Sequence, residues 1–203
     1  MPKLGARDDC LQREQLPLWF DAVRTLADPA KAAYLQGLQL TGARREELAR
    51  LHWDDVEFQW GALTIRDKVE GERVIPLTPY LATLLDALPR RNDWVFSSPT
   101  SKTGRMGGAN QAHTKALRAA GLPHITLHGL RRSFGTLSEW VECPVGVVAQ
   151  IQGHKPSAIA EKHYRRRPLD LLRKWLTKIE GWMLDEAGIP QPEPGAGRLR
   201  VAK

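Results

Sequence analysis

His128 and Arg131 form a short motif in which two side chains of chemical interest stand three residues apart. On a helix, this spacing places both side chains one turn apart on the same side. A guanidinium group matches two phosphate oxygens, and an imidazole beside it can add a hydrogen bond or move a proton. The motif therefore indicates phosphate chemistry, and the alternative is a surface pair without a function.

Arg44 lies at the start of a short charged helix predicted over residues 43–51. The start of a helix favours an anion because its first backbone N–H groups have no partner within the helix. Glu47 follows three residues later, close enough on such a helix to hold the Arg44 guanidinium. The alternative is an ordinary capped surface helix with a Glu–Arg pair.

An imidazole and a phenol follow in the last third of the chain. His154 comes between two predicted helices, where it can face the same pocket as His128. Tyr164 lies in a basic stretch, and neighbouring positive charge favours the phenolate by lowering the pKa of a tyrosine from about 10. The alternative is a tyrosine ring that packs beside a strip of DNA-contacting residues. The charged neighbours of Tyr164 are Glu161, Lys162, His163, Arg165, Arg166 and Arg167.

The basic surplus of the chain is confined to one region. Residues 90–178 carry a net charge of +11, whereas residues 1–89 carry −3 and residues 179–203 carry −1, which gives +7 over 203 residues. This asymmetry indicates a polyanionic partner, most often a nucleic acid. The alternative is a solvated surface that happens to be basic.

Composition excludes several classes of protein. Two cysteines, Cys10 and Cys143, are too few for a disulfide scaffold or a Cys-rich metal cluster. No apolar run approaches the ~20 residues of a membrane span, and no N-terminal signal peptide is visible, so we expect a cytoplasmic protein that does not enter a membrane. The sequence also lacks the GxSxG, GxxxxGK[ST] and HExxH motifs of hydrolases, nucleotide-binding loops and metalloproteases.

Hydrophobic periodicity predicts a mainly helical domain with a small three-stranded antiparallel β-sheet, an α+β fold. The domain is predicted over residues 1–187, followed by a Pro- and Gly-rich tail over 188–203 that cannot bury a core. The predicted strands are 56–60, 62–66 and 73–77, with turns at Gly61 and at 70–72. The predicted helices are 16–26, 30–40, 43–51, one opening at 78–79, 108–120, 129–141, 144–152, 156–163 and 168–187.

Taken in order, these motifs resemble the catalytic domain of the tyrosine recombinase (phage integrase) family, in particular integrases of prophage or genomic-island type. The resemblance extends from about residue 12 to 180 and implies the fold of that catalytic domain. Each motif is short, but all five occur in the family's order at matching separations. The motifs are residues 41–48, 68–77, 127–136, 153–156 and 163–164.

The resemblance implies a mechanism that needs no metal, no ATP and no other cofactor. In this family a tyrosine attacks a DNA phosphodiester, forms a 3′-phosphotyrosyl link and releases a 5′-hydroxyl, and a second 5′-hydroxyl then attacks that link. By resemblance Tyr164 is the nucleophile, Arg44 and Arg131 clamp the non-bridging oxygens, and Lys68 protonates the leaving 5′-oxygen. The alternative for Lys68 is a plain solvent-exposed lysine.

The remaining site residues are also assigned by resemblance. His128 matches the histidine that accepts the tyrosine proton, with His163 as a lower-ranked competitor, and His154 matches a position that hydrogen-bonds the phosphate. Glu47 matches an acidic position that supports the site. The basic residues in or beside the motifs are expected to contact DNA; they are Arg45, Arg132, Lys155, Arg165, Arg166 and Arg167.

The resemblance also implies partners: double-stranded DNA at attachment sites, and other protomers of the same integrase in a DNA-bound tetramer. Family members usually carry an N-terminal core-binding domain, for which there is no room before residue 12. We therefore expect the catalytic part of a longer integrase, and the alternative is a naturally short member. Two other functions stay open: nicking and resealing by a type IB topoisomerase, and a non-catalytic DNA-binding remnant.

The predicted helix over 168–187 is amphipathic, with Trp175 and Trp182 on its apolar face. Such a face can pack on its own domain. Because C-terminal segments of recombinases dock on a neighbouring protomer, our hypothesis is that this helix makes that contact when DNA brings protomers together.

Overall fold

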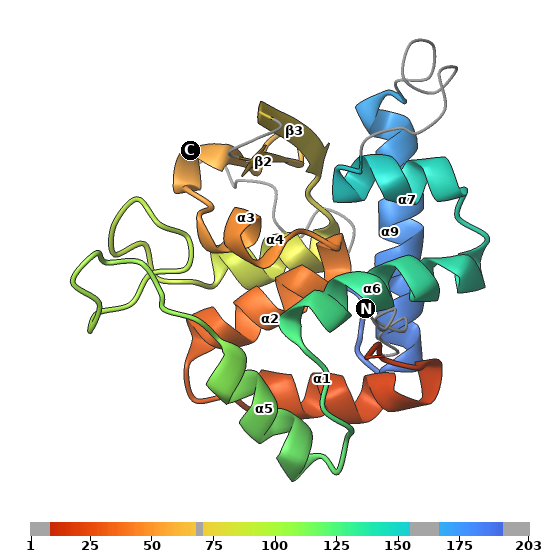
Figure 1. The fold of residues 1–203 in the computed structure, drawn as a ribbon. Helices are drawn as coiled ribbons and strands as arrows, with labels where there is room; N and C mark the ends of the chain where they lie inside the picture. Colours follow the sequence, from red (N-terminus) through yellow and green to blue (C-terminus); the bar gives the residue numbers. More distant parts are fainter. Residues whose placement is uncertain (1–8, 68–70, 155–166, 193–203) are drawn as a thin grey trace, which may run out of the picture.

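The computed structural model describes residues 9–67, 71–154 and 167–192. Helices form most of it, and the small antiparallel sheet lies at one end (Figure 1), which confirms the predicted fold class. None of the described helices is both long and apolar enough to cross a membrane. The α-helices are α1 (Leu16–Arg24), α2 (Pro29–Thr41), α3 (Arg45–Ala49), α4 (Pro79–Asp86), α5 (Asn110–Ala119), α6 (Leu127–Leu137), α7 (Val145–Gln152) and α9 (Leu169–Glu186). Short 3₁₀ turns are η1 (Arg13–Gln15), η2 (Trp53–Asp55) and η3 (Ser138–Val141).

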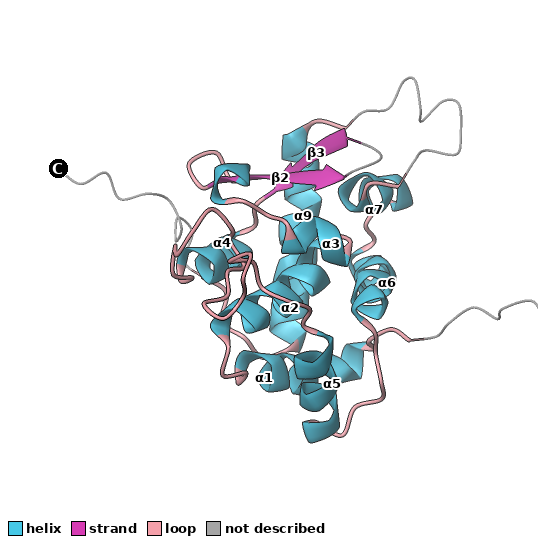
Figure 2. Ribbon diagram, turned by 60° about the vertical axis from the view of Figure 1, so that its left-hand side comes forward, coloured by secondary structure: helices cyan, strands magenta, loops and turns pink. Residues whose placement is uncertain are grey.

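The sheet has the strand order β1-β2-β3, with β1 at Val56–Glu57, β2 at Ala62–Asp67 and β3 at Gly71–Pro76. Alternate residues of β2, Leu63 and Ile65, are buried, as the two-residue period of a strand requires, whereas burial in β3 is confined to its end, at Ile75 and Pro76. The first strand is shorter than predicted, because the chain turns after Glu57 and Gly61 adopts a left-handed φ of 59°. The third strand begins two residues earlier than predicted, with Gly71 paired to Asp67. Figure 2 shows this sheet beside α3 and α7, at the opposite end from α1 and α5.

The central helix is α2, whose residues are nearly all buried. Its ends follow local signals: the Asp28 carboxylate accepts hydrogen bonds from the N–H groups of Ala30 and Lys31, and Gly42 ends the helix at a φ of 60°. Gly42 also allows other helices to approach, since a Cβ there would lie 2.5 Å from a ring carbon of Phe134 in α6. The end of α2 is therefore packed directly against α6.

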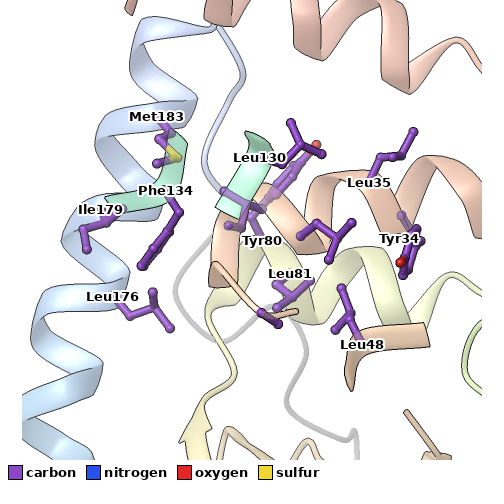
Figure 3. Packing of buried hydrophobic residues seen from close by; sticks show 14 of the residues in the cluster. Tyr34, Leu35, Leu48, Tyr80, Leu81, Leu130, Phe134, Leu176, Ile179 and Met183 are labelled. Carbon is purple, nitrogen blue, oxygen red and sulfur yellow. The ribbon is translucent and has the colours of Figure 1, made fainter. Parts of the chain in front are cut away.

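The apolar face of α9 is buried within this domain. Figure 3 shows Leu176, Ile179 and Met183 of α9 beside Phe134 of α6, and all four are fully buried. Trp175 and Trp182 are partly buried against the same core. The alternative, that the apolar face of this helix packs on its own domain, is therefore confirmed. Contact of the helix with a neighbouring protomer when DNA brings protomers together stays a prediction.

A carboxylate on α9 also holds the start of α4. Glu180 is buried, accepts hydrogen bonds from the N–H groups of Tyr80 (2.9 Å) and Leu81 (3.2 Å), and accepts another from the Thr78 hydroxyl. Burial raises the pKa of the Glu180 carboxyl, and these hydrogen bonds oppose the rise only in part. The N–H groups that a helix start leaves without internal partners are thus satisfied from a helix about 100 residues away in the sequence.

The core continues past the predicted start of the tail at residue 188. Gly188 has a left-handed φ of 66° and turns the chain, so that the N–H of Ile189 donates to the carbonyl of Leu184 (2.9 Å). Ile189 is only 4% exposed. The prediction that nothing from 188 onward contributes to the core is therefore wrong at Ile189. The predicted helix over 156–163 and the tail beyond 192 lie outside the described residues.

Candidate functional site

Three arginines meet at the C-terminal end of α7. Three consecutive backbone carbonyls there each accept a hydrogen bond from a different guanidinium: that of Ile151 from Arg73 (3.0 Å), that of Gln152 from Arg131 (2.9 Å) and that of Gly153 from Arg44 (3.3 Å). The last carbonyls of a helix have no partner within it and carry the negative end of the helix dipole. The end of α7 is therefore suited to gathering cations that would otherwise repel one another.

Arg131 is fixed by the packing of α2, α6 and α7. Its guanidinium also donates to the carbonyl of Gly42 (2.6 Å), and its own carbonyl accepts a hydrogen bond from the Gln152 side chain (2.8 Å). Only 5% of the residue is exposed. The hydroxyl of Thr126 caps α6 by accepting from the N–H of Gly129, which starts the helix two residues earlier than predicted. His128, in the first turn of α6, is exposed.

Arg44 is the N-cap residue of α3, and the predicted pair with Glu47 is confirmed. The Arg44 guanidinium donates to the Glu47 carboxylate (2.7 Å), which also accepts from the backbone N–H of Arg44 (2.8 Å). The same guanidinium donates to the carboxylate of Asp67 (3.0 Å), the last residue of β2. Sequence reasoning missed Asp67, because nothing local to α3 indicates that the end of a strand would reach it.

Arg73 of β3 is the second residue that sequence reasoning missed. It forms a two-fold ion pair with the Glu47 carboxylate, at 3.0 and 2.7 Å. Burial works to raise the pKa of the Glu47 carboxyl, but the hydrogen bonds and charges of Arg73 and Arg44 outweigh it and the pKa is lowered. The sequence contains one indication that Arg73 faces the site: it is a basic residue directly before the apolar residues Val74 and Ile75 of a predicted strand.

These contacts create a site that favours an anion. Three guanidinium groups, those of Arg44, Arg73 and Arg131, lie at the end of α7, and two carboxylates, those of Glu47 and Asp67, pair with Arg44 and Arg73. The positive charge is therefore only partly balanced by these acids. The next side chain along the chain is the exposed imidazole of His154, which follows Gly153 in its left-handed turn (φ 72°). Two of these arginines, Arg44 and Arg131, match the predicted clamp and can hold the oxygens of a phosphate.

The predicted DNA-contacting arginines in the described part of the chain have other partners as well. Arg132 forms an ion pair with Asp9, and Arg45 is an exposed residue of α3 whose guanidinium is 3.8 Å from Glu46. Arg167 donates to the carbonyl of Gly146 (3.0 Å) and so braces α7 just before the start of α9. Contact of these three residues with DNA stays a prediction.

Several predicted site residues lie outside the described residues: Lys68, Lys155, His163, Tyr164, Arg165 and Arg166. Their roles stay predictions. The described residues that precede the two segments are both at the site. Asp67, before Lys68, contacts Arg44, and His154, before Lys155, directly follows the carbonyl that Arg44 contacts. Of the predicted residues that are described, the structure thus brings together Arg44, Glu47 and Arg131, with His154 next to them.

Comparison with known sequences gives consistent matches. The sequence profile of the phage integrase family matches residues 10–168. Prophage integrase IntF of Escherichia coli (strain K12) is 63% identical over 189 residues, which cover 90% of this chain and 40% of that protein. Tyrosine recombinase XerD of Listeria innocua is 34% identical over 120 residues, which cover 51% of this chain and 39% of that protein. The chain therefore spans about 40% of the length of these relatives.

Solved structures share the fold at low sequence identity. The integrase from mycobacterium phage Brujita matches with a TM-score of 0.69 at 18% identity, over 95% of this chain and 63% of that one. A lambda integrase dimer bound to a COC′ core site matches with a TM-score of 0.62 at 16% identity, over 83% and 65% of the two chains. The order of the motifs, the three arginines at the end of α7 and these matches lead to one conclusion: the chain belongs to the phage integrase family of tyrosine recombinases.

Proposed function

We propose that this chain supplies the catalytic domain of a site-specific DNA recombinase that cleaves and rejoins DNA through a 3′-phosphotyrosyl intermediate. One observation carries the proposal: Arg44 and Arg131, from separate parts of the sequence, are held on the adjacent carbonyls of Gly153 and Gln152. Two fixed guanidinium groups suit a phosphate whose charge increases as its phosphorus becomes five-coordinate.

The proposed reaction begins with attack by Tyr164. Its phenol oxygen bonds to the phosphorus, its proton passes to His128, and the bond from phosphorus to the 5′-oxygen breaks. The released oxygen takes a proton from Lys68. In the second step another strand's 5′-hydroxyl attacks the phosphotyrosyl link and gives its proton to Lys68, while the Tyr164 oxygen leaves and takes back the proton from His128. Bond energy is kept in the link, so that the reaction needs no ATP.

Arg44 and Arg131 stabilise the transition state in this proposal. Well-placed donors to a developing oxyanion contribute roughly 3–4 kcal/mol each. The two arginines thus supply the positive charge that metal ions supply in many nucleases, and the proposed reaction needs no metal. The exposed His154 imidazole adds a hydrogen bond to the same phosphate.

The names of similar proteins support the proposed substrate and assembly. The 63%-identical relative is a prophage integrase, and the solved structures with this fold include XerH recombinase bound to its difH substrate and a lambda integrase tetramer bound to a Holliday junction. We therefore propose double-stranded attachment-site DNA as the substrate, other protomers of the same integrase as partners in a DNA-bound tetramer, and the bacterial cytoplasm as the place of action. Integrase and recombinase relatives favour recombination over relaxation by a topoisomerase.

A nicked suicide substrate tests the proposed function. After cleavage such DNA loses a short fragment and cannot be rejoined, so the covalent adduct accumulates and is counted on a denaturing gel. We expect the unaltered chain to form the adduct and Tyr164→Phe to form none, while DNA affinity stays within about twofold because only the nucleophilic oxygen is lost.

Three outcomes would contradict this proposal. An adduct that persists in Tyr164→Phe identifies another nucleophile. DNA binding by the unaltered chain without any adduct indicates a non-catalytic remnant. Relaxation of a supercoiled plasmid that lacks an attachment site indicates a topoisomerase.

A further inference from the structure

We propose that Arg73 is a positioning residue that keeps Arg44 able to bind the scissile phosphate by holding the charge of Glu47, and that it also fixes the turn before His154. This inference deepens the proposed function and rests on it. The contacts of Arg73 are with the Glu47 carboxylate and with the backbone at Ile151 and Gly153, and in this proposal it acts through them.

Glu47 shares its negative charge between two arginines. Its carboxylate accepts one side-chain hydrogen bond from Arg44 and two from Arg73, and the Arg73 side chain is the less exposed of the two arginines, at 17% against 36%. Arg44 already has a second carboxylate, that of Asp67. Without Arg73, the Glu47 carboxylate would pair with Arg44 alone, and Asp67 would still pair with Arg44 as well. The two carboxylates would then offset more of the positive charge of Arg44, which would attract a phosphate less strongly.

Arg73 also contacts the backbone that precedes His154. Arg73 donates to the carbonyl of Ile151 (3.0 Å), and its guanidinium lies against Gly153, where a Cβ would be 2.8 Å from a guanidinium nitrogen and 2.9 Å from the central carbon. Arg73 thus occupies the space that a side chain at residue 153 would need. The glycine before His154 is explained by this contact as well as by its left-handed φ.

The same contacts connect the β-hairpin to the helical part of the site. Arg73 lies on β3 and holds the carbonyl of Ile151 at the end of α7, while Asp67 at the end of β2 holds Arg44. Residues 68–70, which include Lys68, lie between these two strands in the sequence. Both strands are therefore connected to Arg44: β2 through Asp67, and β3 through Arg73 and Glu47. A substitution of Arg73 would act on Arg44, on the turn at Gly153 and on this connection.

A rescue experiment separates charge sharing from a purely structural role. We would measure the single-turnover rate of adduct formation on the suicide substrate, at saturating DNA, for the full 203-residue chain and for Arg73→Gln, Glu47→Gln and the double variant. The matched control is Arg66→Gln, which removes an arginine from the neighbouring strand β2, where it pairs with Asp55 at 2.7 Å. Thermal unfolding of every variant is recorded in parallel.

We expect Arg73→Gln to slow adduct formation about 10- to 100-fold, the range typical of a mispositioned catalytic group, and Arg66→Gln to change it less than about twofold. The double variant should form the adduct at least about threefold faster than Arg73→Gln, because Glu47→Gln removes the negative charge that would otherwise pair with Arg44 alone. If Arg73 has a purely structural role, the double variant should be no faster than Arg73→Gln, because Glu47→Gln removes a second buried partner from the same ion pair.

Each remaining outcome has a distinct meaning. Equal rates for Arg73→Gln and the unaltered chain overturn this inference alone, and so does a double variant no faster than Arg73→Gln. Absence of an adduct from the unaltered chain overturns the proposed function and this inference together.

If Arg73→Gln does not fold, Arg73→Lys is measured in its place. Lysine keeps the charge, but its single ammonium group cannot both pair with Glu47 at two oxygens and donate to the Ile151 carbonyl. We then expect an intermediate rate, and an unchanged rate overturns the inference.

Discussion

Acidification should destabilise the fold through one buried histidine far from the proposed site. His113 of α5 is 1% exposed, and its ring nitrogen Nε2 accepts a hydrogen bond from the indole N–H of Trp19 in α1 (3.0 Å). Burial, with a smaller contribution from the charge of His124, lowers the pKa of His113 from 6.5 to about 4. The hydrogen bond requires the neutral imidazole, since a protonated nitrogen has no lone pair to accept with.

The magnitude follows from the difference between the folded and unfolded chains. Above pH 6.5 His113 is neutral in both states and the stability is at its full value. As the pH falls from 6.5 towards 4, the unfolded chain binds a proton that the folded chain does not, which costs about 1.4 kcal/mol per pH unit. The free energy of unfolding should therefore fall by about 2 kcal/mol by pH 5 and about 3 kcal/mol in total, with no further loss from this group below about pH 4.

Urea unfolding followed by tryptophan fluorescence at pH 7.5 and at pH 5 measures this change. The control is His113→Gln, which does not titrate and keeps a side-chain acceptor for the Trp19 indole. Other groups titrate in both proteins, so the informative quantity is the pH effect in the unaltered chain minus that in the variant, expected to be about 2 kcal/mol. The same pH effect in both proteins would refute the assignment to His113.

Two further predictions concern the proposed site and its partner. Arg131→Lys should slow single-turnover adduct formation about 10²- to 10³-fold, because one ammonium cannot hold the carbonyls of Gly42 and Gln152 and also face a phosphate; a change under about tenfold would contradict the role of Arg131. The chain should bind duplex DNA weakly, with little sequence preference, and lose most of its affinity between about 50 and 200 mM salt, as phosphate contacts by a basic surface do. Fluorescence anisotropy tests this, and tight, salt-insensitive binding to one site would exclude it.

Features that depend on near neighbours could be predicted from the order of the residues. The helix predicted over 30–40 is confirmed because its apolar spacing and the glycine that ends it, Gly42, are signals within a few residues of each other. The pair of Arg44 and Glu47 could be predicted because three residues on a helix fix their separation. Resemblance added the order of the motifs, and with it the family.

The distant residues that complete the site could be found only from how the chain folds in space. Arg73 and Asp67 reach Glu47 and Arg44 from the hairpin, and no local rule relates a strand to the start of a short helix. The carbonyls at the end of α7 are equally hidden from sequence reasoning, because any residue type supplies a carbonyl and only the fold decides which side chain meets it.

The same reason explains what sequence reasoning left open, and where it went wrong, in the C-terminal part. The pattern of α9 predicts an apolar face but not what covers it, and the structure shows that its own core does. Ile189 was assigned to a tail because Pro and Gly surround it, although a single turn at Gly188 returns it to the core. Composition reports the average character of a segment, whereas burial depends on where the fold directs each side chain.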